Sequence, residues 1–385
     1  MKLPIYLDYN ATTPHDPDVI AAMQPYIDEY FGNPSSSYQY GAQSKAAVEN
    51  ARSQVALLLH CSPSEIVFTS GGTESNNFAL KGVAFHNRKN GNHIITTHIE
   101  HPAVLEVCKY LESNGFEITY LPVDEYGIVR VTDVKKALNS NTILITVMHA
   151  NNEVGSIQPI AGIADIAKER GILLHTDAAQ SIGKIPTDVR SMGVDLLTIA
   201  GHKIYAPKGI GALYIRGGLQ LSSLLHGAGQ ENGRRPGTEN ILAIVGLGKA
   251  CEIADKDLKR NMNHMKEMRD RLYTALKGKI KNIKINGHPD ERLPNTLSLS
   301  FKDLDANTIL SKIKEDVAVS AGAACHSDKI EVSHVLRAMN VPVEWARGTL
   351  RFSTGRMTSK KEIDQASELI SNAVQQLLKT NSSHG

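Results

Sequence analysis

The sequence predicts an α/β protein, with a mostly parallel sheet covered by helices on both faces and a smaller α+β unit after it. Three observations lead to this prediction. Short apolar runs alternate with stretches of helical length from about residue 44 to residue 260. A long charged segment, about 252–277, then leads into a pattern with fewer and mixed elements. A chain of 385 residues is also too long for one ordinary core, so more than one domain is expected.

Seven apolar runs in the first part have the length and composition of strands. Amphipathic stretches separate most of them; in 101–115, for example, Val104, Cys108 and Leu111 fall on one helical face. Strands that alternate with helices in this way pair in parallel, and both faces of their sheet are covered. The predicted strands are EIVFTS (65–70), HIITTHI (93–99), FEITYL (116–121), TILITVM (142–148), GILLHTD (171–177), DLLTIA (195–200) and GALYI (211–215).

The last third of the chain predicts the smaller unit. The charged segment is expected to form a long connecting helix. Ser359 and Glu362 form a capping box at the start of a final helix. We therefore predict a large domain over residues 15–260 and a small domain formed by 1–14 and 261–385. The other elements expected in the small domain are strands at NTLSLSF (295–301), VAVSAG (317–322) and TLRFSTG (349–355), and a helix near 305–314.

Charge and composition exclude several classes of function. The 42 basic and 40 acidic residues are interspersed and leave a net charge of +2, so nothing favours nucleic acid or an anionic membrane as a partner. The lysine cluster KGKIKNIK (277–284) alternates with apolar residues and is expected to be a solvated face. The sequence shows no run of about 18 apolar residues and no signal-peptide pattern. The four cysteines have neither disulfide nor metal-ligand spacing, so we expect a cytoplasmic protein without a metal site.

Polar residues follow several predicted strands, and ligands of parallel sheets collect at the carboxyl ends of the strands. The turn Gly71-Gly72-Thr73 joins a strand to a helix, so its amides suit a phosphate group. Asp177, followed by Gln180, suits either an ion pair with a protonated ring nitrogen or a helix cap. His101, just before a proline, suits either a cap or an imidazole stacked on a flat ring.

Lys203 lies in TIAGHKIYAPKGIG (198–211), between two runs that are expected to be buried strands. One interpretation is that the lysine extends its amine to the surface from a loop. The other is that a desolvated amine with a lowered pKa bonds covalently to a carbonyl group.

With these residues in view, the sequence resembles the cysteine desulfurases and selenocysteine lyases, which are class V aminotransferase-like enzymes that depend on pyridoxal phosphate. The resemblance covers nearly the whole chain. It implies the fold type I of such transferases, with 15–260 as the cofactor-binding domain. Ten blocks in family order carry it: YLDYNATTP (6–14), FGNPSS (31–36), FTSGGTESNN (68–77), EHPAV (100–104), MHANNEVGSIQPI (148–160), HTDAAQSIGK (175–184), GHKIYAPKGIGALY (201–214), RRPGTEN (234–240), SAGAAC (320–325) and LRFSTGR (350–356).

The resemblance also implies a role for each site residue. Lys203 would bond covalently to the cofactor aldehyde, Asp177 would pair with the pyridine nitrogen, and Gln180 would bond the phenolic oxygen. Asn152 and Arg351 would bind the substrate carboxylate, a task that suits the planar fork of arginine. The other implied cofactor contacts are His101, which would stack on the ring and help to move protons, and, around the phosphate, Gly72, Thr73, His202 and Thr238, the last contributed by the partner subunit of a homodimer.

The chain departs from the family pattern at two positions. Ala200 stands where many family members have a phosphate-binding serine, so one phosphate contact is missing or supplied elsewhere. Asn232 stands where relatives often carry arginine, near the expected rim of the dimer.

Cys325 follows a small-residue strand end and precedes a polar stretch, so we expect it on a loop rather than in a core. A thiol beside His326 and Lys329 could have a lowered pKa and act as a nucleophile. The resemblance implies that Cys325 attacks the γ-sulfur or selenium of the substrate, carries it as a persulfide and leaves alanine. The segment 320–334 is then expected to move, because the thiol must both reach the site and deliver its sulfur.

Several alternatives stay open. AACHSD and VPVEWARGTLRFSTGR resemble selenocysteine lyases, whereas EVSHVLRAM and RRPGTEN resemble bacterial desulfurases; we expect L-cysteine as the substrate, with L-selenocysteine as the alternative. An aminotransferase or racemase of the same fold, and a non-catalytic sulfur-relay or scaffold protein with an inert Lys203, are the other candidates. The expected acceptor of the sulfur is a protein such as an iron–sulfur scaffold, and tRNA thiolation is another route.

Overall fold

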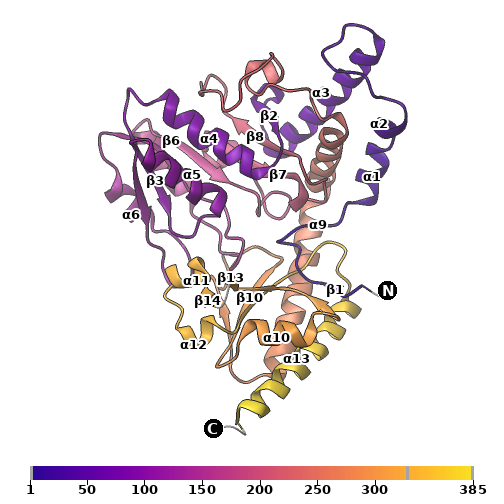
Figure 1. Ribbon diagram of the computed structural model, residues 1–385, viewed down its shortest axis with the longest axis vertical. Helices are drawn as coiled ribbons and strands as arrows, with labels where there is room; N and C mark the ends of the chain where they lie inside the picture. Colours follow the sequence, from indigo (N-terminus) through magenta and orange to yellow (C-terminus); the bar gives the residue numbers. More distant parts are fainter. Residues whose placement is uncertain (1–2, 327–328, 383–385) are drawn as a thin grey trace.

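The computed structural model describes residues 3–326 and 329–382; for 323–326, 329–331 and 381–382 it describes the backbone alone. The chain forms two units, one above the other in Figure 1, and α9 (Ile241–Lys279) runs along both. The larger unit holds a seven-stranded sheet and the smaller unit a four-stranded sheet. This arrangement confirms the predicted α/β fold with a smaller α+β unit.

All seven strands predicted in the first part are present, and they form one sheet in the order β2-β8-β7-β6-β5-β3-β4. β8 is antiparallel to both of its neighbours, and the other neighbouring pairs are parallel. Interior parallel strands are buried on both faces, which is why continuous apolar runs predicted them. The strands are β2 (Ile66–Thr69), β3 (His93–Thr97), β4 (Glu117–Leu121), β5 (Thr142–Thr146), β6 (Leu173–Asp177), β7 (Leu196–Ala200) and β8 (Gly211–Ile215).

Helices cover both faces of this sheet (Figure 1). Successive residues of β2 point to opposite faces, so Ile66 and Phe68 join one hydrophobic cluster and Val67 joins the other. The first cluster includes residues of α3, α7 and α9, and the second includes residues of α4 and α5. Besides α9, the helices of this unit are α1 (Pro17–Met23), α2 (Pro25–Asp28), α3 (Gln39–Leu59), α4 (Gly72–His86), α5 (Pro102–Ser113), α6 (Val131–Ala137), α7 (Ile160–Glu169) and α8 (Val189–Met192), with short 3₁₀ turns η1 (Pro63–Glu65), η2 (Gly201–Lys203) and η3 (Glu231–Gly233).

The small unit is built on an antiparallel sheet in the order β12-β15-β10-β9. The run VAVSAG, predicted as one strand, is divided: β11 pairs with β1 and β12 pairs with β15, so two different partners interrupt it. The predicted capping box is present, since the Ser359 amide donates to the Glu362 carboxylate and the Glu362 amide donates to the Ser359 hydroxyl. The elements are β1 (Ile5–Tyr6), β9 (Ile283–Asn286), β10 (Thr296–Phe301), β11 (Val317–Ala318), β12 (Ser320–Ala321), β15 (Thr349–Ser353), α10 (Ala306–Ile313), α11 (His334–Ala338), α12 (Val343–Ala346) and α13 (Lys360–Ser382).

The connecting helix α9 is longer than the sequence predicts, because it begins at Ile241 rather than near residue 252. Its first turns contain glycines that weaken the helical pattern but allow close packing: a Cβ on Gly248 would lie 2.6 Å from Ala51 of α3. The helix passes without a break through residue 260, where we predicted the domain boundary, and that boundary stays a prediction. In the part of the chain that the structure describes, no helix combines the length and apolarity that membrane crossing requires.

The backbone of Cys325 lies in a strand and not in the loop that the sequence predicts. β13 (Ala323–His326) pairs antiparallel with β14 (Lys329–Val332), and Cys325 is opposite Ile330. Ser327 and Asp328, between the two strands, lie outside the described residues. The pattern of small and polar residues therefore predicted a loop where the chain forms a short hairpin.

Candidate active site

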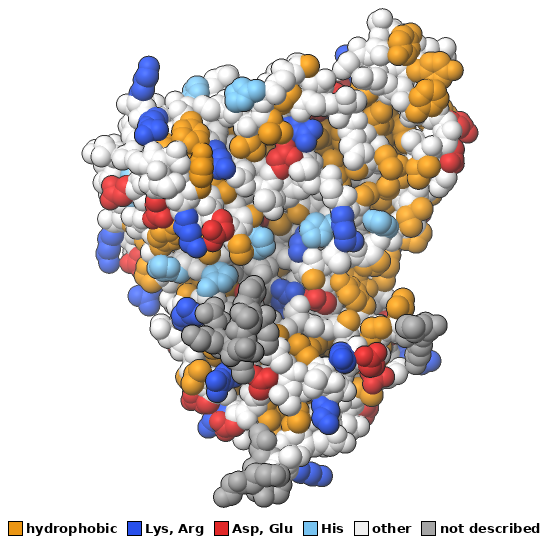
Figure 2. Space-filling model, in the orientation of Figure 1, with side chains coloured by type: hydrophobic (Ala, Val, Ile, Leu, Met, Phe, Trp, Pro, Cys, Tyr) orange, Lys and Arg blue, Asp and Glu red, His pale blue; other side chains and the backbone are white. Residues whose placement is uncertain are grey.

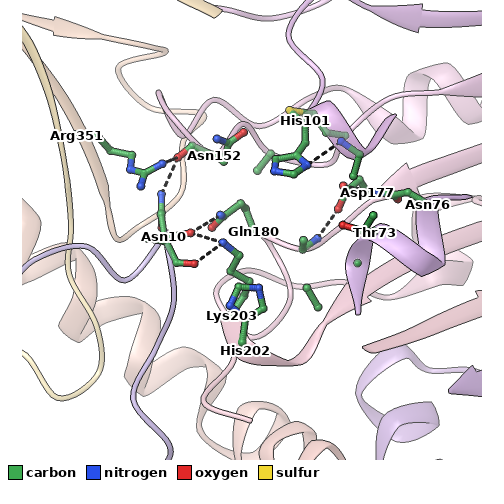
Figure 3. Close-up of a pocket in the computed structure, with 17 residues that line it drawn as sticks. Asn10, Thr73, Asn76, His101, Asn152, Asp177, Gln180, His202, Lys203 and Arg351 are labelled. Carbon is green, nitrogen blue, oxygen red and sulfur yellow. Dashed lines mark hydrogen bonds between the residues drawn. The ribbon is translucent and has the colours of Figure 1, made fainter. Parts of the chain in front are cut away.

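A cavity of about 300 Å³ lies between the two units, where the ends of β6 and β7 and the start of α4 face β15 (Figure 3). It brings together most of the residues singled out from the sequence, although they come from distant segments. Asn10 and Asn76 also line it, and sequence reasoning assigned them no role. The predicted residues that line the cavity are Gly72, Thr73, His101, Asn152, Asp177, Gln180, His202, Lys203 and Arg351.

Lys203 ends the η2 turn after β7, and its amine points into the cavity (Figure 3). Its Nζ donates to the carbonyl oxygens of Asn10 at 2.6 Å and Ala11 at 2.8 Å. Burial, and next the charge of Arg351, lower the pKa of this amine to about 8, although nearby carboxylates oppose the shift. The lysine is therefore held inside the protein with part of its population neutral near pH 7, and it does not extend to the surface.

Asp177, at the end of β6, has one carboxylate oxygen for each of two neighbours. Oδ1 accepts from the Ala179 amide at 2.9 Å, and Oδ2 accepts from Asn76 Nδ2 at 2.7 Å. Oδ1 thus closes a turn and does not cap a helix, because the next helix along the chain is α8 (Val189–Met192), whose cap is Asp188. Asn76 orients the carboxylate from α4. Asn76 is itself buried, and its Oδ1 has no hydrogen-bond partner among the described residues.

The start of α4, where we predicted a phosphate-binding turn, lies at the cavity. Gly71 precedes the helix with φ 147°, and the amides of the first helical turn have no partner within the helix. A Cβ on Gly72 would lie 3.3 Å from the Ala200 methyl group, so a side chain there would narrow the cavity. On the opposite wall, His202 Nδ1 lies 3.2 Å from Thr12 Oγ1, and burial lowers the pKa of its imidazole to about 4. The imidazole of His202 is therefore neutral at physiological pH.

His101 caps α5, because its Nδ1 accepts from the Ala103 amide at 3.1 Å. Partial burial lowers the pKa of the imidazole, and the charge of Lys203 lowers it further. The neutral ring therefore carries its proton on Nε2, the nitrogen that does not cap the helix. The capping interpretation is therefore confirmed, and stacking on a flat ring stays a prediction for an imidazole that lines the cavity.

Arg351 is already engaged on the far wall of the cavity. Its guanidinium donates to the Asp8 carboxylate at 2.8 Å, to the Ser320 hydroxyl at 3.0 Å and to the backbone carbonyl of Asn152 at 3.1 Å. Its Nε is buried and has no partner among the described residues. The side chain is thus fixed at the cavity wall, with Asp8 as a counter-ion that the sequence did not reveal.

Comparison with known proteins identifies the family. The model of the aminotransferase class-V family matches residues 5–366. A protein named cysteine desulfurase IscS from Dictyoglomus turgidum is 48% identical over 378 residues, which are 98% of this chain and 96% of that protein. The chain belongs to the cysteine desulfurase family. The protein of the same name from Methanosarcina thermophila is 48% identical over 374 residues, 97% of this chain and 92% of that one. A solved NifS-like protein has a TM-score of 0.91 at 39% identity, covering 97% of this chain and all of the other.

Membership of this family makes the chain an enzyme that depends on pyridoxal 5′-phosphate, and the cavity fits that cofactor. The unpaired amides at the start of α4 suit a phosphate, and the oriented carboxylate of Asp177 suits a protonated ring nitrogen. A buried amine of lowered pKa suits an aldehyde. When bound, the cofactor supplies an electron-withdrawing ring that accepts charge from the substrate Cα.

Two predicted site residues are not placed in the cavity. Thr238 is exposed in the segment between η3 and α9 and does not line the cavity of its own chain. That segment is anchored by Glu231, whose carboxylate accepts from Arg52 at 2.7 Å and from the Phe68 amide at 2.9 Å. Asn232 adopts a left-handed conformation with φ 55°, which asparagine tolerates better than most residues. The side chain of Cys325 lies outside the described part of the structure.

Proposed function

We propose that this chain is a cysteine desulfurase that converts L-cysteine to L-alanine and takes the sulfur onto Cys325 as a persulfide. One observation carries the proposal: the Lys203 amine, the Asp177 carboxylate and the Arg351 guanidinium converge on one cavity in a chain that is 48% identical to proteins named cysteine desulfurase. Those relatives favour L-cysteine over the alternative, L-selenocysteine. They also argue against an aminotransferase or a non-catalytic relay protein.

Lys203 has two roles in the proposed reaction. Its partly neutral amine would hold the cofactor through its aldehyde group, and it would serve as the base for the proton on the substrate Cα. Asp177 would pair with the ring nitrogen of the cofactor, and Asn76 keeps the Asp177 carboxylate in place. His101, neutral and protonated on Nε2, is positioned to pass protons at the open side of the cavity.

Arg351 and Asn152 hold the substrate carboxylate. Because its Nε is buried, the guanidinium has to share the N–H groups of its other two nitrogens between the substrate and their present partners, such as Asp8. This contact would fix the carboxylate end of the substrate at the wall of the cavity.

The transfer step uses Cys325 as the nucleophile. The Cys325 thiolate attacks the sulfur of the substrate, the carbon–sulfur bond breaks, and the substrate carbon is protonated to leave alanine. One thiol and one cysteine thus yield one persulfide and one alanine, and no external oxidant is needed. A second thiol, on the acceptor, later removes the outer sulfur; an iron–sulfur scaffold protein is the class of acceptor we propose, within the cytoplasm.

The hairpin that carries Cys325 must move for this transfer, as the small and polar composition of 320–334 suggests. Hydrogen exchange checks this, because amides of β13 and β14 should exchange much faster than those of β6 and β7. Fully protected amides in the hairpin would contradict the proposed delivery.

We also propose that the enzyme is a homodimer in which Thr238 reaches the phosphate of the partner. Figure 2 shows hydrophobic side chains gathered over the region of α1 to α3, at the upper right. The large apolar side chains exposed there are Ile20, Ile27, Phe31, Tyr38 and Tyr40. Such a patch is typical of an interface, and a second copy that covers it fits the exposed position of Thr238.

Mixing two inactive variants tests the role of Thr238. In a mixed dimer of Lys203→Ala and Thr238→Ala subunits, one site regains both native residues if Thr238 acts across the interface, so activity should return on mixing. If Thr238 acts within its own chain, neither site is complete and mixing restores nothing. The molar mass in solution, compared with 41.9 kDa for one chain, checks the dimer itself.

The direct test of the proposed activity is mass spectrometry of the protein after incubation with L-cysteine. The Cys325 peptide should gain one sulfur atom, and alanine should form. Turnover of L-selenocysteine is measured in parallel, and a rate on L-cysteine that is negligible beside it would make the enzyme a selenocysteine lyase.

A further inference from the structure

Lys184 is a buried lysine to which the proposed function assigns no role. Its side chain is only 4% exposed, directly behind the cavity. No carboxylate among the described residues forms an ion pair with it, and the acceptor of its ammonium group is the side-chain amide of Gln180, at 3.0 Å. A buried ammonium group without a counter-ion is costly, so a structural role alone would be met better by an apolar side chain.

Lys184 is linked to the catalytic lysine through a short chain of hydrogen bonds. Gln180 Oε1 accepts from Lys184, and Gln180 Nε2 donates to the carbonyl of Asn10 at 2.9 Å. The same carbonyl accepts from Lys203 Nζ at 2.6 Å, as Figure 3 shows. The Lys184 amine donates to the amide oxygen and the Asn10 carbonyl can only accept, so both neighbours favour the same orientation of the Gln180 amide. One N–H of that amide is left for the cavity.

The surroundings of Lys184 are cationic. Lys203 and Arg351 are the two cations whose charges act on it. Arg356, Tyr9 and Tyr205 line the small space behind it, and burial raises the pKa of Tyr205. Burial, and next the charges of Lys203 and Arg351, lower the pKa of the Lys184 amine to about 7. The protein thus keeps a strong donor at this position against an unfavourable environment.

We propose that Lys184 is a positioning residue that holds the Gln180 amide with an N–H directed into the cavity, where it donates to the ring oxygen of the cofactor. Without Lys184, the Asn10 carbonyl alone orients the amide, so a larger share of the molecules should present the amide oxygen to that ring oxygen, where two acceptors would repel. The inference rests on the proposed contact between Gln180 and the cofactor, and it adds the residue that makes this contact possible.

Lys184→Met tests the proposal in enzyme loaded with pyridoxal 5′-phosphate. The readout is the pH midpoint at which the visible absorption of the bound cofactor changes. Loss of a donated hydrogen bond to the ionised oxygen should raise this midpoint by about one unit. Lys208→Met, at an exposed lysine in the same segment as Lys203, is the matched control and should leave the midpoint unchanged.

A double-mutant cycle shows whether Lys184 acts through Gln180. Gln180→Glu, which has no N–H to donate and can pair with Lys184, should raise the midpoint by a similar amount. Adding Lys184→Met to Gln180→Glu should then change it little further. An unchanged midpoint in Lys184→Met, or a shift of full size in both backgrounds, would overturn the proposal. An unchanged midpoint in Gln180→Glu would instead show that the proposed Gln180 contact is wrong.

Stability separates a positioning role from a structural one. Because methionine replaces a desolvated amine by an apolar group of similar length, urea unfolding of Lys184→Met should require at least as much denaturant as wild type. A Lys184→Met protein that fails to fold would make Lys184 a structural residue and would also overturn the proposal.

Discussion

Lys203 and Cys325, the two residues proposed to react, are carried by very different pieces of the chain. Lys203 follows β7, which has a neighbouring strand on each side within a seven-stranded sheet, and two carbonyl groups hold its amine. Cys325 lies in β13, which forms a two-stranded sheet with β14. An isolated pair of strands gains little stability of its own in water. The difference separates a group that is fixed before reaction from a group that has to move in the proposed mechanism.

The base of the hairpin is nevertheless attached to the large unit. The Ser333 hydroxyl donates to the buried Glu153 carboxylate, and His334 Nε2 lies 3.0 Å from the carbonyl of Glu100. Glu100 itself is fully buried at the end of β3, and burial raises its pKa to about 8. The hairpin that carries Cys325 is therefore attached to the large unit by Ser333 and His334, the residues that follow β14.

The largest expected effect is at the fixed site. Lys203→Ala should lower alanine formation by more than about 10⁴-fold, because it removes both the covalent anchor and the base. The measurement is alanine release from L-cysteine, with Lys208→Ala as the control. Borohydride reduction of the wild-type holoenzyme should attach the cofactor to residue 203. A label on another residue would contradict the proposed role of Lys203.

Cys325→Ala should have the next largest effect, and it tests the travelling group alone. Sulfur release should fall by more than about 10³-fold, while cofactor absorption and affinity stay as in wild type. Cys61→Ala is the control, since burial raises the pKa of that thiol to about 12 and leaves it unreactive. Undiminished sulfur release in Cys325→Ala would favour an aminotransferase or racemase.

The sequence predicted the fixed region better than the travelling one. Strands with buried faces produce continuous apolar runs, and the polar residues at their ends, such as Asp177 and Lys203, fall in the cavity by topology alone. Asn10, Asn76 and Lys184 were missed, although they lie within the quoted motifs YLDYNATTP, FTSGGTESNN and HTDAAQSIGK. Asn10 and Asn76 act through partners distant in the sequence, which no local pattern reports. Lys184 contacts Gln180, four residues away, in a segment that forms no helix and so gives no periodic signal.

The small unit shows the same limit. The division of VAVSAG into two strands depends on β1, which is more than 300 residues away in the sequence. The hairpin at Cys325 has the small and polar composition of a loop, and its pairing gives no alternating hydrophobic signal. Strand pairing without an alternating hydrophobic pattern leaves little trace in the sequence.

Arg351→Lys sharpens the comparison from the substrate side. A lysine cannot reproduce a planar fork that contacts Asp8, Ser320 and the substrate carboxylate together, so kcat/KM for L-cysteine should fall by roughly 30-fold. Arg347→Lys, at an exposed arginine four residues earlier, is the matched control. An unchanged kcat/KM would remove Arg351 from the proposed carboxylate site.

The pH dependence of cofactor uptake tests the protonation state of Lys203 without a mutation. The pKa of Lys203 is lowered to about 8, so its reactive neutral form grows as pH rises through that value. Uptake of pyridoxal 5′-phosphate by the apoprotein should therefore become about tenfold faster from pH 7 to pH 9 and level off above it. Visible absorbance follows the reaction, and a rate that falls over this range would contradict the assignment of the amine.

Ser333→Ala should have the smallest effect, and it should alter only the attachment of the hairpin that carries Cys325. Ser333 caps α11 by accepting from the Val335 amide at 3.1 Å, and it ties the end of the hairpin to Glu153. Losing a cap of this kind costs about 1 kcal/mol, so transfer of sulfur from Cys325 should change by roughly threefold to fivefold. Ser359→Ala removes the equivalent cap of α13, far from Cys325, and should leave transfer unchanged. Because Ser333 contacts nothing that holds Lys203, the absorption of the bound cofactor should be that of wild type. A shifted spectrum would mean that the Cys325 hairpin and the region around Lys203 are coupled more tightly than their separate sheets imply.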